Sequence, residues 1–194
     1  MSYLIKTTQP TSEPVSLSDA QLHLRLDTSG SPPTHPDDTL VQTLISASRE
    51  SAENYANITV AQCQYQLKAE AIDDKVDLQT FPVTAIASVT YKDDAGATQT
   101  VSSSAYYINN HLKPSQLVFY NDAPSYEMTI TFTAGFTDGE QSNPFPCPAG
   151  IKAAILLMLG NWYENRETVS NIESFERPQS AIYLLTPYRI NMGT

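Results

Sequence analysis

The chain has 194 residues, of which 41% are hydrophobic, enough for one globular core or for one core with an inserted lobe. Its net charge is −10 and the acidic excess is spread along the chain, which argues against a protein that grips nucleic acid through phosphates. Such an acidic surface aids solubility, and it would also let a DNA duplex slide past without sticking.

Targeting and redox signals are sparse. No charged-then-apolar leader opens the sequence, and the most apolar predicted helix is too short to span a bilayer. Cys63 and Cys147 lie far apart without metal-ligand spacing, which favours two free thiols in a reduced intracellular setting.

The N-terminal third predicts an arm and two helices. Residues 1–14 are polar, contain two prolines and predict an extended arm. Ser16, with Asp19 three residues later, predicts the cap of a short helix over 17–26. A proline-rich loop at 28–36, of undetermined role, precedes a helix from Asp37 or Asp38 to about residue 55. That helix has an apolar stripe, and Ser46, Arg49, Glu50 and Glu53 fall outside it.

From residue 63 onward, apolar residues recur at every second position instead of at helical spacing. Alternation over 63–69, followed by short β-rich runs near 76–78, 86–92, 98–101, 106–108, 117–120 and 128–133, predicts an antiparallel β lobe. The turn Asp93-Asp94-Ala95-Gly96 predicts a hairpin between two of these strands.

The most informative segment is a helix beginning near Pro148 or Ala149 that is apolar on almost every face. A helix of this kind must be covered all round, either by the rest of its chain or by a neighbouring subunit. The residues predicted for this core or subunit interface are Ile151, Ile155, Leu156, Met158, Leu159, Trp162 and Tyr163, the last two favouring the core. Pro178 starts a last helix, which Pro187 ends.

This order of elements predicts an α+β fold. A small helical bundle formed by residues 1–60 and 141–194 would carry an inserted antiparallel β lobe at 61–140.

Signs of catalysis are weak. His23 lies near acids of its own helix, and His35 with Asp37 and Asp38 is better explained by a helix start than by a metal site. The pairs Asp73-Asp74 and Asp93-Asp94 fall in predicted turns, and the sequence has no phosphate-binding glycine loop and no nucleophile elbow. The sequence therefore predicts a protein that is not an enzyme and uses no metal or cofactor.

Several motifs, taken in order, resemble one family. They are the segment 14–20 leading to His23-Leu24-Arg25-Leu26-Asp27, Asp37-Asp38 before 44–50, Thr131–Phe136, Ile155–Leu159 with 161–166, and 184–189. This order resembles the head–tail connector, or adaptor, proteins of tailed double-stranded DNA bacteriophages, prophages and related gene-transfer particles.

The resemblance implies a structural virion protein at the head–tail junction, assembled in the host cytoplasm. About a dozen copies would form a homo-oligomeric ring on the capsid portal, extend the DNA channel close to packaged DNA, and dock the tail or the next connector. Copies could be monomeric in isolation. The resemblance also favours portal contact through 187–194, with Pro187, Tyr188, Arg189 and Ile190 as anchors, although Tyr188 and Ile190 could instead complete the core.

Two other interpretations stay open. A tail-completion or stopper protein would also form a ring but would be mostly β. A β-lobe module that binds a carbohydrate or peptide is conceivable with eleven tyrosines.

Overall fold

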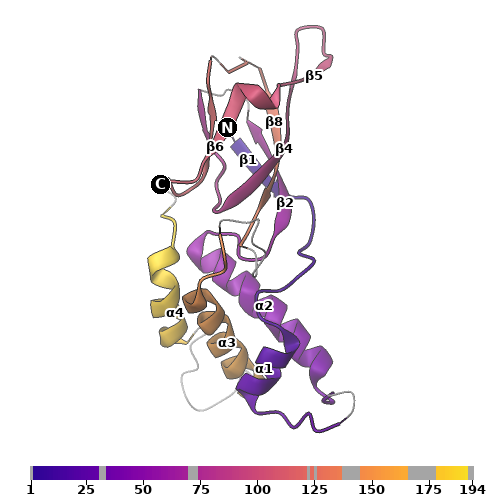
Figure 1. Ribbon diagram of the computed structural model, residues 1–194, viewed down its shortest axis with the longest axis vertical. Coiled ribbons are helices and arrows are strands. Elements are labelled where there is room, and N and C mark those ends of the chain that lie inside the picture. Colours follow the sequence, from indigo (N-terminus) through magenta and orange to yellow (C-terminus); the bar gives the residue numbers. More distant parts are fainter. Residues whose placement is uncertain are drawn as a thin grey trace. The chain divides into compact units, whose positions relative to one another are not determined.

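A computed structural model describes residues 2–30, 34–69, 74–121, 123–124, 126–136, 145–165 and 178–191. These residues form four α-helices and two antiparallel sheets, which confirms the predicted α+β class (Figure 1). The chain divides into two compact units. A sheet unit comprises residues 1–12, 57–145 and 190–194, and a helical unit comprises 13–56 and 146–189.

The larger sheet has five strands in the order β1-β2-β8-β4-β5. Their bounds are β1 Ser2–Lys6, β2 Cys63–Ala69, β8 Met128–Ala134, β4 Val83–Lys92 and β5 Thr98–Thr100. Alternate residues of β8 are fully buried, among them Met128, Ile130 and Phe132, because β8 is the central strand and one of its faces lies on the core.

The smaller sheet has the order β3-β7-β6, with β3 Lys75–Asp77, β7 Gln116–Phe119 and β6 Tyr106–Asn109. A short 3₁₀ turn, η1 Ser103–Ala105, precedes β6. Leu117 from this sheet joins Leu67, Ile130 and Phe132 from the larger sheet in one apolar cluster. Each such side chain stabilises the unit by roughly 1.5–3 kcal/mol when buried.

The extended arm predicted at residues 1–14 forms a paired strand, β1, in its first part. Ser2–Lys6 pairs with β2 in antiparallel register, from Ser2 opposite Ala69 to Lys6 opposite Tyr65. The amide of Thr7 donates to the carbonyl of Gln64, and the amide of Gln64 donates to the hydroxyl of Thr8. The observed division therefore differs from the predicted boundaries, because residues 1–12 and 57–60 belong to the sheet unit.

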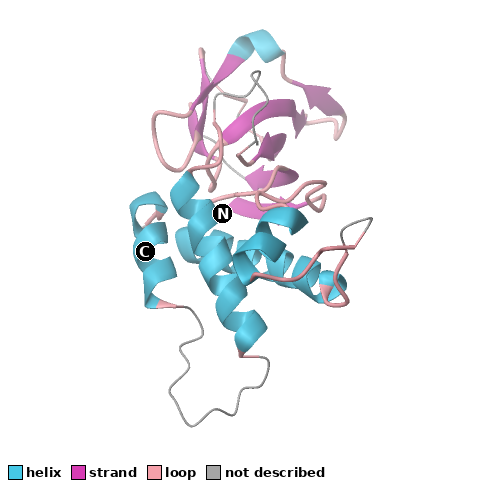
Figure 2. Ribbon diagram, turned by 60° about the horizontal axis from the view of Figure 1, so that its bottom comes forward, coloured by secondary structure: helices cyan, strands magenta, loops and turns pink. Residues whose placement is uncertain are grey.

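The helical unit contains α1 Leu17–Leu24, α2 Asp38–Ala56, α3 Ala149–Glu164 and α4 Gln179–Leu185, followed by the 3₁₀ turn η2 Thr186–Tyr188 (Figure 2). Helix α2 packs on α3, and α3 packs on α4. The predicted cap of α1 is confirmed, since the amide of Asp19 donates to the hydroxyl of Ser16 at 3.1 Å. Helix α1 ends at Arg25, whose φ of 56° is left-handed.

Helix α3 is covered unevenly. Ile151, Ala154, Ile155, Met158 and Leu159 are buried. Leu156, Leu157, Trp162 and Tyr163 are half-buried. The described part of this chain therefore covers one side of α3 fully and the other side partly.

Within the described residues, no helix is both long and apolar enough to cross a membrane.

Candidate functional site

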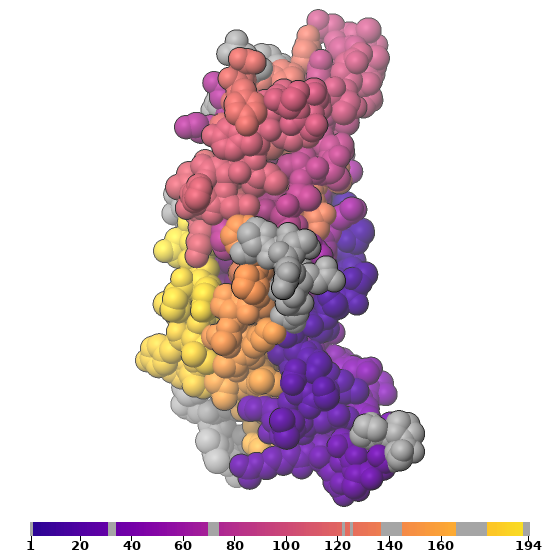
Figure 3. Space-filling model, viewed as in Figure 1, coloured from indigo at the N-terminus to yellow at the C-terminus, as the bar shows by residue number. Residues whose placement is uncertain are grey.

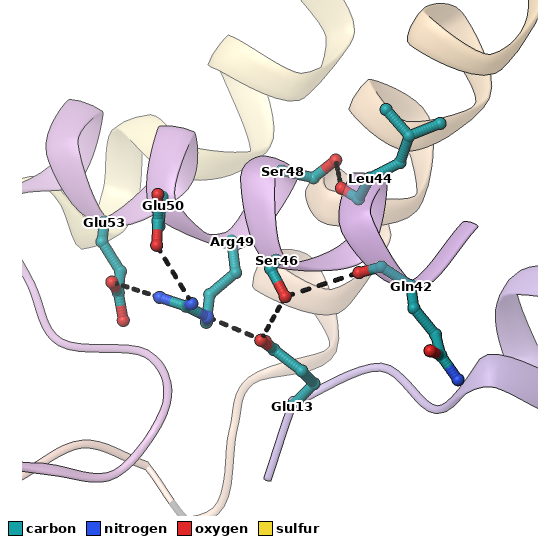
Figure 4. Close-up of polar contacts among 8 residues, drawn as sticks. All are labelled: Glu13, Gln42, Leu44, Ser46, Ser48, Arg49, Glu50 and Glu53. Carbon is teal, nitrogen blue, oxygen red and sulfur yellow. Dashed lines mark hydrogen bonds and ion pairs between the residues drawn. The ribbon is translucent and has the colours of Figure 1, made fainter. Parts of the chain in front are cut away.

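The buried core of the helical unit carries one charged cluster, built on α2 (Figure 4). Arg49 is 2% exposed, and its Nε donates to Glu13 at 2.7 Å while its Nη1 donates to Glu53 at 2.8 Å. Glu50 lies 3.4 Å from the same guanidinium. Burial opposes the charged form of Arg49, but the surrounding carboxylates outweigh it and raise its pKa.

This cluster joins the segment before α1 to α2. Glu13 belongs to the segment before α1, and its other oxygen accepts a hydrogen bond from the Ser46 hydroxyl at 2.8 Å. Both oxygens of Glu13 are thus held by α2. The arrangement fixes the segment before α1 against α2, at the point where the chain enters the helical unit.

A hollow with a volume of about 390 Å³ opens beside this fastening. Val15, Leu17 and Ile45 supply its apolar lining, and Glu13, Gln42 and Ser46 supply polar groups. The hollow leaves no local signal in the sequence, because its two sides come from segments about thirty residues apart.

The predicted histidine and carboxylate candidates have structural partners. His35 accepts a hydrogen bond on Nδ1 from the Asp37 amide at 3.1 Å. Asp37 accepts the Tyr163 hydroxyl at 2.6 Å, and Asp38 accepts the Gln21 side chain at 2.6 Å and the His35 amide at 2.9 Å. These contacts fasten the start of α2 to α1 and α3, and they account for the half-buried position of Tyr163.

The remaining candidates from the sequence are His23, the two cysteines and the Asp73-Asp74 pair. His23 is exposed and lies beside Gly160 of α3, where an added Cβ would be 3.3 Å from its Nε2. Both cysteines are free thiols, Cys63 buried and Cys147 half-buried. Across the described ranges, no three His, Cys, Asp or Glu side chains group closely enough to hold a metal ion. Asp73 of the Asp73-Asp74 pair lies outside the described residues.

The four residues predicted to contact a portal separate into two kinds. Pro187 and Arg189 are exposed, and Arg189 lies over the Tyr55 ring with its Cζ 5.2 Å from the centroid. Tyr188 is half-buried against Gly150, and Ile190 is 2% exposed with its carbonyl accepting a hydrogen bond from Asn57. The last three residues, 192–194, lie outside the described part.

Large exposed apolar side chains mark further surfaces. On the helical unit these are Leu22 of α1, 79% exposed, and Tyr183 of α4, 69% exposed. On the sheet unit Tyr107 and Tyr120 lie with ring centroids 5.2 Å apart, 43% and 63% exposed.

Comparison with known proteins gives similarity of fold. No protein-family model matches the chain, and no curated protein matches its sequence significantly. A chain of the "Neck of empty GTA particle computed with C6 symmetry" matches with a TM-score of 0.79 and 18% identity, over 99% of this chain and 97% of that one. A chain of the "Virion of native gene transfer agent (GTA) particle" matches with a TM-score of 0.77 and 19% identity, over 98% of this chain and 97% of that one. A chain of the "Neck of native GTA particle computed with C12 symmetry" matches with a TM-score of 0.74 and 17% identity, over 99% of this chain and 97% of that one.

Proposed function

We propose that this protein is a head–tail connector, or adaptor, of a tailed phage or phage-like particle. In this role it binds the capsid portal as a ring, extends the DNA channel and docks the tail or the next connector. The observation that carries the proposal is the similarity of fold, over almost the whole of both chains, to chains of particle necks.

Ring assembly is supported by two observations. The similar chains come from necks computed with sixfold and twelvefold symmetry. In this chain, Leu156, Leu157 and Trp162 of α3 remain half-buried, which leaves apolar area for a neighbouring subunit to cover. A ring buries two different patches of each subunit, so partial exposure in one copy is expected.

The proposed role is structural and non-enzymatic, and its site in the virion is the head–tail junction, reached after assembly in the host cytoplasm. The buried charged cluster supports this role, because Arg49, Glu13 and Glu53 bind one another and fasten α2. The net charge of −10 suits a channel wall past which DNA moves.

We propose the C-terminal segment as the portal contact. Of the predicted anchors, Pro187 and Arg189 are the exposed members, so they would meet the portal directly. Tyr188 and Ile190 would hold the segment in place from within the chain, through Gly150 and Asn57.

The test is a pull-down with the cognate portal, followed by negative-stain imaging. Wild-type protein is compared with Arg189→Ala, with a deletion of 191–194, and with Lys92→Ala as a control that removes an exposed cation of the sheet unit. A ring stacked on the portal that weakens with Arg189→Ala or the deletion, but not with Lys92→Ala, supports both the role and the contact.

Other outcomes separate the alternatives. A ring on the portal that tolerates both C-terminal changes keeps the role and moves the contact elsewhere. Absence of portal binding by the wild type overturns the connector role. Binding to a completed connector would then favour a stopper or tail-completion protein. A saturable carbohydrate or peptide ligand at Tyr107 and Tyr120 would favour a β-lobe binding module.

A further inference from the structure

Arg189 is an exposed cation on a well-held part of the backbone. It directly follows η2, and its amide donates to the carbonyl of Thr186 at 3.2 Å. The preceding Tyr188 packs against Gly150 of α3, where an added Cβ would lie 3.2 Å from the tyrosine oxygen. The space-filling view shows the C-terminal segment, in yellow, at the surface beside α3, in orange (Figure 3). These contacts fix where the Arg189 side chain leaves the backbone.

The ring of Tyr55, near the end of α2, supports the guanidinium of Arg189. The Arg189 Cζ is 5.2 Å from the centroid of this ring, within the range of a cation–π contact. The Tyr55 hydroxyl lies 3.4 Å from that of Thr186, which joins the ring to η2 as well. A planar guanidinium stacked on an aromatic ring keeps the N–H donors at its edge available, and it loses less freedom when a partner binds.

Within the described part of the chain, no carboxylate pairs with this guanidinium. The ion pairs between described residues all involve Arg49, so Arg189 takes part in none of them. Residues 178–194 contain no Asp or Glu, although the chain has 21 of them, and Arg189 is the one charged side chain in this stretch. An exposed arginine that is stacked on an aromatic ring and lacks an internal carboxylate is suited to anchoring a partner.

The chemistry of Arg189 favours a carboxylate over DNA as its partner. The rigid fork of a guanidinium matches the two oxygens of one carboxylate through two parallel N–H···O bonds. DNA affinity instead grows with the number of phosphates that are neutralised, and residues 178–194 hold no second basic side chain to add to that number. An acidic side chain of another protein therefore suits this site.

We propose that Arg189, oriented by the ring of Tyr55, binds a carboxylate of the capsid portal through two charge-assisted hydrogen bonds. The inference rests on the proposed connector function, in which the C-terminal segment meets the portal. It adds the chemical class of the portal group and a positioning role for Tyr55.

Portal affinity, measured by biolayer interferometry at several salt concentrations, tests this pairing. Arg189→Gln removes the charge, whereas Arg189→Lys keeps the charge without the fork. Tyr55→Leu removes the aromatic ring, whereas Tyr55→Phe retains it. Lys92→Gln is the matched control for the loss of one exposed cation, and circular dichroism checks that each variant is folded.

We expect Arg189→Gln to weaken portal binding by about tenfold or more and to make the remaining affinity less dependent on salt. Arg189→Lys keeps the salt dependence at an intermediate affinity. Tyr55→Leu weakens binding roughly two- to fivefold with the salt dependence unchanged, and Tyr55→Phe binds close to wild type. Lys92→Gln leaves both the affinity and its salt dependence unchanged.

Each contrary result has a separate meaning. Portal binding that Arg189→Gln does not weaken, or weakens no more than Lys92→Gln does, overturns the carboxylate pairing and leaves the connector role intact. Weakening by Arg189→Gln without any effect of Tyr55→Leu overturns the positioning role. Self-association without portal that depends on Arg189, measured by sedimentation, assigns the carboxylate to a second copy and overturns the portal pairing. Absence of portal binding by the wild type overturns the connector role and the pairing together.

Discussion

At the scale of single residues, Gly135 occupies a position that only glycine fits. Its φ is +128°, and an added Cβ would lie 2.6 Å from the Cα of Gln62 and 2.8 Å from the carbonyl carbon of Ala61. Both neighbours are backbone atoms and cannot rotate away. The amide of the next residue, Phe136, donates to the carbonyl of Val60 at 3.0 Å, which holds the two segments together at this crossing.

We expect Gly135→Ala to lower the free energy of unfolding by roughly 2–5 kcal/mol, through backbone strain and overpacking together. Gly96→Ala is the matched control, since φ there is +78° but nothing lies within 4 Å of the added Cβ. Its expected cost is about 1–2 kcal/mol. Urea unfolding of the two variants measures the difference, and equal losses would contradict the close approach at Gly135.

Asp93 organises the hairpin turn between β4 and β5. Its side chain accepts hydrogen bonds from the Gln99 side chain at 2.8 Å and from the amides of Ala97 and Ala95 at 2.8 and 3.0 Å. These bonds, led by the one from Gln99, lower the pKa of the Asp93 carboxyl.

A lowered pKa makes this turn sensitive to acid. The carboxylate stabilises the hairpin above the unfolded pKa of about 3.9, and that contribution is lost as the pH falls through the lower folded value. We expect Asp93→Asn to flatten the decline of the thermal midpoint below about pH 4 relative to wild type. Parallel pH profiles check this, and unchanged slopes would contradict it.

The burial of Arg49 shows what the sequence could not reveal. The helical stripe of α2 excludes Arg49, and its partner Glu13 stands 36 residues away, outside any local pattern. The pair Arg49 and Glu53 does have the i, i+4 spacing of a helical ion pair, which is a signal of pairing but not of burial.

We expect Arg49→Met to cost about 3–5 kcal/mol of unfolding free energy, because it leaves the carboxylates of Glu13 and Glu53 without their cation. Glu50→Gln is the control on the same guanidinium. Since the Glu50 side chain is 57% exposed, its expected cost is at most about 1 kcal/mol. Denaturant titration measures the free energy of unfolding of both variants. Similar small decreases in the two would show that the cluster does not stabilise the packing of α2.

At the scale of elements, long periodic segments were predictable and a short edge strand was not. Helices α2 and α3 repeat their apolar residues over many positions, so the pattern alone predicts them. Strand β1 has five residues, and its exposed and half-buried positions show no clear alternation. It becomes a strand because β2 offers a free edge, and that partner lies about sixty residues away.

The candidate surfaces were predictable only in part. Seven residues of α3 were predicted for the core or a subunit interface. Ile151, Ile155, Met158 and Leu159 are buried, whereas Leu156, Trp162 and Tyr163 are half-buried. The hollow lined by Val15, Leu17 and Ile45 depends on which segments pack together, so composition and spacing could not predict it. The portal contact at 187–190 stays a prediction.

At the scale of the whole molecule, the acidic charge limits affinity for DNA. Its net charge is −10, and the acidic excess occurs in each third of the sequence. Phosphate neutralisation by basic side chains supplies most non-specific affinity for DNA, and this chain has no cluster to provide it.

We therefore expect the isolated protein to bind duplex DNA more weakly than about 10⁻⁴ M at physiological salt. A gel-shift titration at several salt concentrations measures this affinity. Retardation that disappears steeply as salt rises would contradict the expectation and reveal a basic surface created by folding.

The interleaving of the two units along the chain has a consequence for synthesis on the ribosome. Every strand in the described part of the chain lies between residues 2 and 134, whereas α2 ends at Ala56 and its partner α3 begins only at Ala149. At the usual elongation rate, roughly 5–20 s pass between the synthesis of α2 and that of α3. During this time α3 does not yet cover the apolar stripe of α2. A nascent chain that stops near residue 145 would carry all the described strands but only α1 and α2 of the four described helices.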